Sequence, residues 1–334
     1  MRPMYEHREV LERLGALTDA PASHHPADQP DLRDGSVYVC PPRLKTALRV
    51  ALVTGRPLLL LGHPGSGKSS IAAYVARNLE WRYYEFVVTA RAEARDLLYR
   101  FDLVRRLADA QVKPGLQLHD IDYVEPGPLW WAINTRSARE RGAGDDDRGP
   151  SRPADDPFIE INRERRETGA VLLIDELDKA DPDVPGGLLV PLGSMRFPVP
   201  ETGAQVAPLT DPGPLRSRLV IITSNEEREL PSAFVRRCIV HRLELPDADG
   251  MIEIAQRHLR GRRLRNDQRT RIRDLAHKVV EARPADPAPD EHVPSVAEFL
   301  DAVHAMLDLG DMLSDTDWEL LEELTITKPS RERP

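Results

Sequence analysis

Cysteine is scarce in this 334-residue chain, which has only two, Cys40 and Cys238. They lie far apart, and neither has a second Cys or a His nearby at metal-ligand spacing. We therefore expect two ordinary reduced thiols, as in a cytosolic protein. No apolar run approaches the length of about eighteen residues that a membrane-spanning helix needs. The N-terminal sequence MRPMYEHREV carries charge where a signal peptide would need an apolar core. These absences predict a cytoplasmic protein that does not enter a membrane.

An excess of basic residues is also missing. The formal net charge is −9, whereas a protein built mainly to coat nucleic acid usually presents a basic face. Hydrophobic residues make up 40% of the chain and charged residues 30%. This composition is that of a globular protein, and it excludes both a coiled coil and a wholly disordered chain. The length accommodates two ordinary domains, or one large α/β domain with an appendage.

Short apolar stretches alternate with helical patterns over much of the chain. Strand character is found at 57–62, 82–88, 170–180 and 218–225, and helical periodicity at 43–55 and 69–79. This alternation predicts an α/β fold with a central parallel sheet and helices on both faces. After about residue 246 the strand signals end, and three helical stretches predict a small helical lid domain.

These signals predict three parts of the chain. Residues 1–36 form an N-terminal helix and a Pro-rich linker, residues 37–245 an α/β domain, and residues 246–334 the helical lid. Within the α/β domain, residues 138–157 are rich in Gly, Pro and charge, and we expect a disordered surface loop there.

The sequence LLLLGHPGSGKSS at residues 58–70 ends an apolar run with a glycine-rich loop. Gly62, Gly67, Lys68 and Ser69 fit the pattern G-x-x-x-x-G-K-[ST], in which backbone N–H groups surround phosphate, the lysine reaches the β- and γ-phosphates, and the hydroxyl ligates Mg²⁺. The alternative is a chance glycine-rich turn, but a predicted strand precedes this loop and a predicted helix follows it, as the motif requires. We expect ATP and Mg²⁺ to bind here, at Gly62, Pro64, Gly65, Ser66, Gly67, Lys68, Ser69 and Ser70.

A second apolar strand, VLLIDEL at 171–177, ends in two carboxylates. Ligands bind at the carboxyl edge of such sheets, so we expect Asp175 to hold Mg²⁺ together with Ser69. Glu176 would polarise the water that attacks the γ-phosphate. An ordinary acidic helix start is the alternative. The adjacent Asp178 and Lys179 are predicted to cap and charge a helix, or to face a neighbouring subunit.

Two further candidates carry weaker signals. Asn225 ends the strand VIITSN, which would lie between the two motif strands and place the amide beside the attacking water; capping of the next turn is the alternative. Arg236 and Arg237, in PSAFVRRCIV, are candidates for a finger that stabilises phosphoryl transfer in a neighbouring subunit. On spacing alone, a surface salt-bridge pair is the simpler interpretation.

Taken together, these four motifs resemble those of the MoxR-type AAA+ ATPases over about residues 40–310. By that resemblance, GHPGSGKS is Walker A, LLIDEL is Walker B, and Asn225 is sensor 1. The arginine finger would be Arg237, with Arg236 as second choice. YVEPGPLWWAI (123–133) resembles the family's GPL segment, and PLGSMRFPVPETG (191–203) resembles a hairpin that projects towards the pore of a ring.

One feature departs from the family pattern. Many AAA+ proteins have a sensor 2 arginine at the start of a lid helix, where this chain has Ser295 and Val296. Either another arginine serves the lid, or the lid closes without one. Trp130 and Trp131 could line a partner surface, although we expect them in the core. The eight arginines of 257–274 lack interleaved aromatics, which favours a solvated lid face or a subunit contact over phosphate polymers.

The function that we expect is hydrolysis of Mg-ATP in an oligomeric ring, by resemblance a hexamer, coupled to remodelling, loading or activation of a partner protein. By family resemblance the partner is a protein with a von Willebrand A domain or another effector. The alternatives are a low-turnover ATP-dependent switch or scaffold, and the ATPase subunit of a nucleic-acid-processing system. Glu176 and Asn225 weigh against the first, and the acidic net charge against the second.

Overall fold

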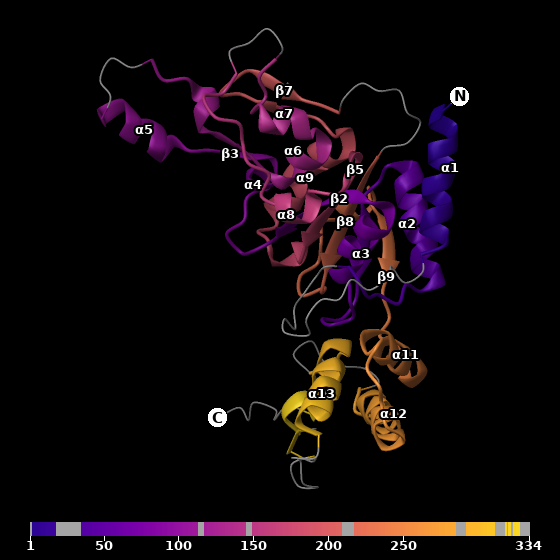
Figure 1. Ribbon diagram of the computed structural model, residues 1–334. Helices are drawn as coiled ribbons and strands as arrows, with labels where there is room; N and C mark the ends of the chain where they lie inside the picture. Colours follow the sequence, from indigo (N-terminus) through magenta and orange to yellow (C-terminus); the bar gives the residue numbers. More distant parts are fainter. Residues whose placement is uncertain are drawn as a thin grey trace.

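The computed structural model describes residues 2–17, 35–112, 117–144, 149–208, 217–284, 292–310, 318, 320–321 and 323–327. An α/β body contains the sheet and the N-terminal helices, and three helices of the C-terminal region lie beside one end of it (Figure 1). The predicted N-terminal helix is α1 (Arg2–Gly15). Most of the predicted Pro-rich linker lies outside the described residues.

Five strands form the central sheet, and every pairing between them is parallel. In spatial order they are β2 (Trp81–Val87), β5 (Arg166–Asp175), β8 (Arg218–Ser224), β1 (Leu58–Leu61) and β9 (Ile239–Arg242). The predicted parallel sheet is confirmed. The sequence did not indicate β9, because this strand has only four residues and none of them is fully buried.

Helices cover both faces of the sheet, as predicted. Successive residues of one strand point to opposite faces: Leu59 joins one buried cluster, whereas Leu58 and Leu60 join the other. This explains the wholly apolar character of the strand. One face carries α1, α2 (Pro42–Thr54) and α3 (Ser70–Leu79), and the other carries α4 (Ala94–Leu98), α6 (Pro128–Ile133), α9 (Asp183–Ser194) and α10 (Ser232–Val235).

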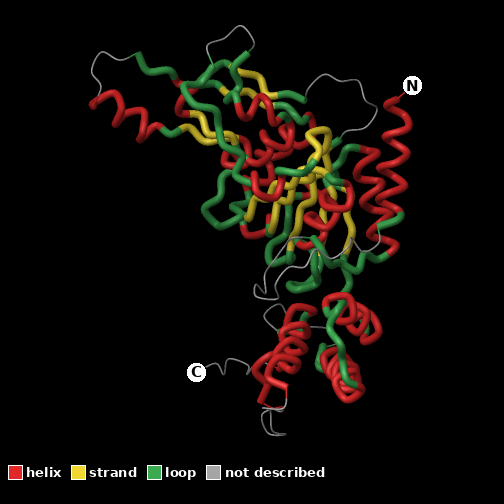
Figure 2. The backbone as a smooth tube through the Cα atoms, in the orientation of Figure 1, coloured by secondary structure: helices red, strands yellow, loops and turns green. Residues whose placement is uncertain are grey.

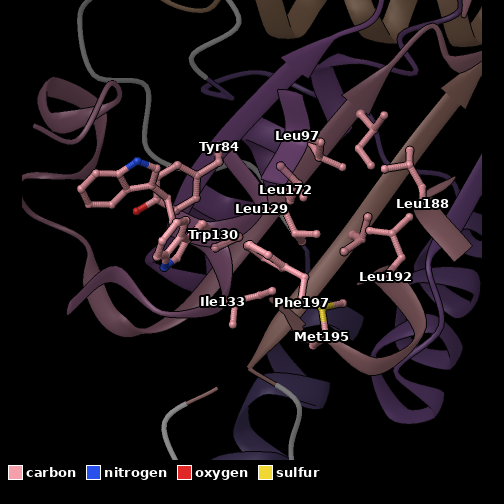
Figure 3. Close-up of a cluster of buried hydrophobic side chains, with 14 of the residues drawn as sticks. Tyr84, Leu97, Leu129, Trp130, Ile133, Leu172, Leu188, Leu192, Met195 and Phe197 are labelled. Atoms are coloured by element: carbon pink, nitrogen blue, oxygen red, sulfur yellow. The ribbon is translucent and has the colours of Figure 1, made fainter. Parts of the chain in front are cut away.

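Both tryptophans of the GPL-like segment belong to the core. Trp130 and Trp131 are 0% and 1% exposed and belong to one buried cluster, in which Figure 3 labels Trp130. Trp130 packs edge-on against Phe197, with ring centroids 5.7 Å apart. The expectation that these rings are core residues is confirmed.

Between β2 and β5 the chain forms an arm whose helix α5 stands away from the body (Figure 1). The arm consists of β3 (Tyr99–Phe101), α5 (Leu103–Val112), the 3₁₀ turn η1 (Asp120–Tyr123) and β4 (Val124–Pro126). Polar contacts hold α5: Arg106 pairs with Asp120 at 2.5 Å, and the Tyr123 hydroxyl donates to Asp109 at 2.9 Å. Its apolar side chains are exposed instead, namely Leu103, Val104, Leu107 and Val112.

The stretch predicted as a surface loop, 138–157, differs from that prediction at its two ends. Helix α7 (Thr135–Arg139) extends into its beginning, where Ala138 is fully buried. Near its end, Asp156 is buried and accepts a hydrogen bond from the Tyr84 hydroxyl at 3.3 Å. The hydrogen bond from Tyr84 of β2 offsets part of the cost of burying this carboxylate. Residues 145–148 lie outside the described residues.

The predicted hairpin after the acidic strand is present but starts later than 191. Helix α9 continues through Pro191 to Ser194, and the antiparallel pair consists of β6 (Phe197–Val199) and β7 (Ala204–Val206). Two short elements, α8 (Ile159–Asn162) and the 3₁₀ turn η2 (Leu177–Lys179), flank β5 along the chain.

The C-terminal region is helical, as predicted. Helices α11 (Ala248–His258), α12 (Asn266–Glu281) and α13 (Val296–Leu309) and the π-helical turn η4 (Glu323–Thr327) surround a buried cluster of their own. Figure 2 shows these helices grouped apart from the strands. Within the described ranges, no helix combines the length and the apolar character needed to cross a bilayer.

Candidate functional site

The predicted site residues other than Arg236 and Arg237 gather where three adjacent strands end. Strands β5, β8 and β1 are neighbours and run parallel, so their carboxyl ends share one edge of the sheet. The glycine-rich loop follows β1, Asp175 ends β5, and Asn225 follows β8. The predicted placement of the VIITSN strand between the two motif strands is confirmed.

The glycines of the loop adopt backbone conformations that other residues rarely adopt. Gly62, Gly65 and Gly67 have φ of 146°, 71° and 87°. A Cβ atom at Gly62 would also lie 2.5 Å from the carbonyl oxygen of Leu243, so a side chain there would clash with backbone. These conformations let consecutive N–H groups face one point, as in a phosphate-binding nest. Pro64 is exposed, and Ser70 is the first residue of α3.

Lys68 is 5% exposed, and its ammonium group is held inside the loop. Its Nζ donates to the carbonyl oxygens of Gly62 and His63, both at 2.7 Å. Burial lowers the pKa of Lys68 to about 8, although the carboxylates of Asp175, Asp178, Glu176 and Glu226 oppose this effect. Neutral carbonyls therefore hold a desolvated cation at the position where a triphosphate would supply negative charge.

Ser69 and Asp175, which are 106 residues apart in the sequence, are in direct contact. The Ser69 hydroxyl donates to Asp175 Oδ1 at 2.6 Å, and the Thr223 hydroxyl donates to the same oxygen, also at 2.6 Å. Ser69 precedes α3 but makes no side-chain cap hydrogen bond. Its hydroxyl is used for this cluster instead. The structure thus brings together the two residues predicted to hold a metal.

This cluster suits Mg²⁺ by its chemistry. Mg²⁺ prefers hard oxygen ligands, and in nucleotide sites it is held by one or two protein groups together with substrate phosphates. Ser69 and Asp175 supply such oxygens beside the phosphate loop. No cluster of three or more His, Cys, Asp and Glu side chains with metal-ligand geometry occurs among the described residues. A phosphate-assisted ion therefore fits the donors better than an ion held by protein alone.

Glu176 lies beside this cluster, in the left-handed region with φ of 60°. Its Oε1 accepts from Asn225 Nδ2 at 3.3 Å, and its Oε2 accepts from Lys179 Nζ at 2.7 Å. Its N–H donates to the Thr223 hydroxyl at 2.8 Å. Glu176 does not cap the turn η2 with its side chain. The carboxylate is therefore held by two donors.

Asp178 has a role that the sequence did not indicate. It is 2% exposed, and its Oδ2 accepts from the backbone N–H groups of Asn225 and Glu227, both at 3.0 Å. The expectation that it caps a helix was wrong. Asp178 instead fixes the turn after β8, and this turn directs the Asn225 amide towards Glu176. Lys179, which was also expected to belong to a helix start, forms an ion pair with Glu176.

Arg236 and Arg237 lie at the opposite edge of the sheet. They precede β9, whose first residue Ile239 pairs in parallel with Leu58, the first residue of β1. Both arginines are exposed, and Arg237 donates to the carbonyl oxygen of Ala233 at 3.0 Å. Arg237 also lines a cavity of about 240 Å³ together with Arg56, Leu189, Leu192, Phe234 and Cys238. The structure does not bring these arginines to the phosphate loop of their own chain.

Two solved structures are similar to the chain at low sequence identity. RuvB of Thermotoga maritima, solved as a point mutant, is 13% identical and has a TM-score of 0.45, with 84% of this chain and 68% of that chain covered. A second structure of that protein, described as a Holliday junction branch migration motor, is 14% identical and has a TM-score of 0.42, with 84% of this chain and 67% of that chain covered. No curated protein matches the chain.

A known protein family matches the part of the chain that contains the site. The family described as AAA domain (dynein-related subfamily) matches residues 57–238. This stretch is 182 of 334 residues, counted as 238 − 57 + 1, and is therefore more than half of the chain. It includes every residue that the sequence predicted for the site, from Gly62 to Arg237.

Proposed function

Because the chain belongs to the family of AAA domains of the dynein-related subfamily, we propose that it is an ATPase that couples hydrolysis of Mg-ATP in an oligomeric ring to the remodelling, loading or activation of a partner protein. The observation that carries this proposal is the 2.6 Å contact between Ser69 and Asp175. It joins the end of the phosphate loop to the acidic strand, as one Mg-triphosphate site requires.

Each residue of the site has a distinct proposed role. The loop N–H groups and Lys68 bind the β- and γ-phosphates, and Ser69 and Asp175 hold Mg²⁺, which when bound neutralises charge on those phosphates. Glu176 accepts the proton of the attacking water, and Asn225 orients that water. Lys68 exchanges its two carbonyl partners for phosphate oxygens, which are stronger acceptors because they are charged.

A ring would bring to each site an arginine from the neighbouring subunit. Arg237 is exposed at the amino end of β9, whereas the loop lies at the carboxyl end of β1. We propose that Arg237 of one subunit completes the site of its neighbour, with Arg236 as second candidate. An arginine supplied in trans contributes about 10³–10⁵ in rate in related phosphoryl-transfer enzymes. The assembly that we propose is a hexamer.

The partner-binding surface that we propose is the arm. Four apolar side chains of α5 are exposed there, while its polar side chains are used within the arm. Such a face suits contact with another protein. By family resemblance the partner has a von Willebrand A domain or is another effector.

One observation favours a second candidate function, a low-turnover ATP-dependent switch. Both carboxylate oxygens of Glu176 are engaged, by Asn225 and Lys179, so the proposed base is restrained in this conformation. A switch would bind ATP and assemble but hydrolyse little.

Steady-state ATPase activity measured over a range of protein concentrations tests the proposal. A ring that shares its arginines gains specific activity as it assembles, and the Lys68→Ala variant provides the matched blank. Specific activity that stays near that blank at every concentration, in a protein that binds ATP, would favour the switch. A preparation that does not bind ATP would refute both.

A further inference from the structure

Arg283, two residues after the end of α12, connects two chain segments that are distant in sequence. Its Nε donates to the carbonyl oxygen of Pro294 at 3.1 Å, and its Nη1 donates to that of Pro246 at 2.5 Å. Pro246 lies between β9 and α11, where the chain leaves the sheet, and Pro294 lies just before α13. One guanidinium group thus joins the exit from the sheet to the start of the last long helix.

Both of these segments border the phosphate loop. On one side, a Cβ atom at Gly65 would lie 2.4 Å from Cβ of Ser295, the residue after Pro294. On the other side, Leu243 donates its N–H to Leu61 at 2.8 Å, and its carbonyl oxygen faces Gly62. The two carbonyl groups that Arg283 binds therefore belong to residues one position from Ser295 and three positions from Leu243 along the chain. Arg283 ties together the two walls of the loop.

The environment of Arg283 is unusual for a cation. Both of its hydrogen-bond acceptors are neutral carbonyls, and burial lowers its pKa. Its Nη2 is buried and has no hydrogen-bond partner among the described residues. A surface arginine would pair with a carboxylate or with water, and a buried donor left without a partner is unfavourable. The rigid, charged fork of the guanidinium group thus binds two carbonyl oxygens at once, although its Nη2 makes no hydrogen bond.

We propose that Arg283 is the positioning residue through which the helical region responds to nucleotide, with Ser295 as its contact to the phosphate loop. This inference rests on the proposed ATP site. When a triphosphate fills the loop, Gly62 and Gly65 shift against Leu243 and Ser295, and Arg283 moves both walls together. Ser295 and Val296 stand at the start of α13, so the proposed arginine comes from the segment that follows α12 and not from the helix that touches the loop.

The side chain of Ser295 strengthens this assignment. Ser295 is 7% exposed and caps α13 by accepting from the N–H of Glu298 at 3.3 Å. The Glu298 carboxylate accepts in turn from the N–H of Ser295 at 2.8 Å. This capping box fixes the first turn of α13. A displacement of Ser295 is therefore passed to the whole helix.

The test uses full-length protein with Glu176→Gln, which prevents turnover, and compares Arg283→Ala and Arg283→Lys in that background. ATP affinity is measured by calorimetry, and amide hydrogen exchange is followed at the start of α13 with and without Mg-ATP. We expect Arg283→Ala to weaken ATP binding about tenfold, a typical coupling between two sites, because the two walls of the loop are no longer joined, and to abolish ATP-dependent protection of residues 296–299. Arg283→Lys keeps a cation near both carbonyls and recovers at least half of this protection.

Arg262→Ala is the matched control, because Arg262 also joins two segments of the helical region, by pairing with Asp308 at 2.5 Å, but is not connected to the loop. It should leave ATP affinity and protection unchanged. With Glu176 restored, Arg283→Ala should raise KM and change kcat less than twofold. Unchanged ATP affinity and protection in a folded Arg283→Ala protein would overturn the proposal, as would equal effects from Arg262→Ala. Absence of ATP binding in the parent protein would instead refute the ATP site itself.

Discussion

Glu176 Oε2 accepts a hydrogen bond from Lys179 Nζ at 2.7 Å, and this ion pair engages the carboxylate proposed as the general base. The hydrogen bond to Glu176 is the largest cause of a raised pKa at Lys179. Glu176 precedes the 3₁₀ turn η2 and Lys179 is its last residue, so the turn brings the two side chains together. A carboxylate that is held by an ammonium group must leave that partner before it can contact a water molecule. If Glu176 is the base that we propose, we expect the pair to restrain hydrolysis until the carboxylate is released.

Removal of this restraint should increase basal turnover. We expect Lys179→Ala to raise kcat of the dilute protein severalfold, because an exposed ion pair of this kind is worth about 0.2–1 kcal/mol. Steady-state ATPase assays at saturating ATP measure the effect. Lys179→Arg keeps the pair and is the matched control. A fall of kcat in Lys179→Ala would mean that the lysine assists catalysis.

Thr223 offers a test of the hydroxyl that links the two acidic residues. Its Oγ1 donates to Asp175 and accepts from the Glu176 N–H. Thr223→Val keeps the shape but leaves a backbone donor unpaired, at a cost of about 1–3 kcal/mol. Denaturant unfolding should show this loss, and kcat should fall because Glu176 loses its anchor. Thr223→Ser retains the hydroxyl and should restore both quantities. Wild-type stability and kcat in the Val variant would contradict this role.

The buried ammonium group of Lys68 predicts a particular pH dependence of stability. Its pKa of about 8 lies below the ordinary 10.5. Between these values the unfolded chain binds a proton that the folded chain lacks, so the free energy of unfolding of the nucleotide-free protein should rise with pH. Below pH 8 both states are protonated, and the full cost of burying the charge remains.

Lys68→Met removes the charge, so the nucleotide-free variant should be more stable than wild type at pH 7. It should also lose the rise in stability between pH 8 and 10. Denaturant unfolding at several pH values measures both effects. Lys68→Arg stays protonated throughout. It should therefore show no rise in stability between pH 8 and 10, and it should not be more stable than wild type at pH 7. An identical pH profile in wild type and Lys68→Met would refute the assignment of this rise to Lys68.

The proposed sharing of Arg237 predicts complementation between inactive variants. Arg237→Ala keeps its own phosphate loop but cannot complete the site of a neighbour, whereas Lys68→Ala retains Arg237 but cannot bind ATP. Mixed and allowed to exchange, the two should recover part of the ATPase activity that each lacks alone. Native mass spectrometry of the mixture verifies that mixed assemblies form. Mixed assemblies without recovered activity would place the arginine elsewhere.

How much of this molecule the sequence could predict depends on whether the signal was local. The parallel sheet and the phosphate loop were predictable because Leu58 to Ser70 contains strand, loop and helix start within thirteen residues. Asn225 was found because it ends an apolar strand. Thr223, two residues earlier, was not chosen, although it contacts both Asp175 and Glu176. Nothing in a strand sequence shows which of its last hydroxyls faces the neighbouring strand.

Other features depend on contacts between distant segments and left no such signal. Asp178 resembles a helix cap in sequence, but its partners are N–H groups 47 and 49 residues further along the chain. Arg283 is one of many arginines, and only the fold shows that it joins Pro246 to Pro294. The composition of 138–157 predicts a surface loop because a charged residue such as Asp156 is seldom buried without partners, and its partners, the Tyr84 hydroxyl and the Phe158 N–H, appear only in the fold.

The central claim is that the loop from Gly62 to Ser69 and the acidic pair Asp175–Glu176 bind one Mg-triphosphate. Isothermal titration calorimetry of Glu176→Gln protein with ATP and Mg²⁺ tests it most directly. We expect one ATP bound per chain, and affinity reduced by at least about a hundredfold when Lys68→Ala is added, because charge-assisted bonds to two phosphates are lost. Absence of binding heat in the Glu176→Gln protein, or equal affinity with and without Lys68, would contradict the claim.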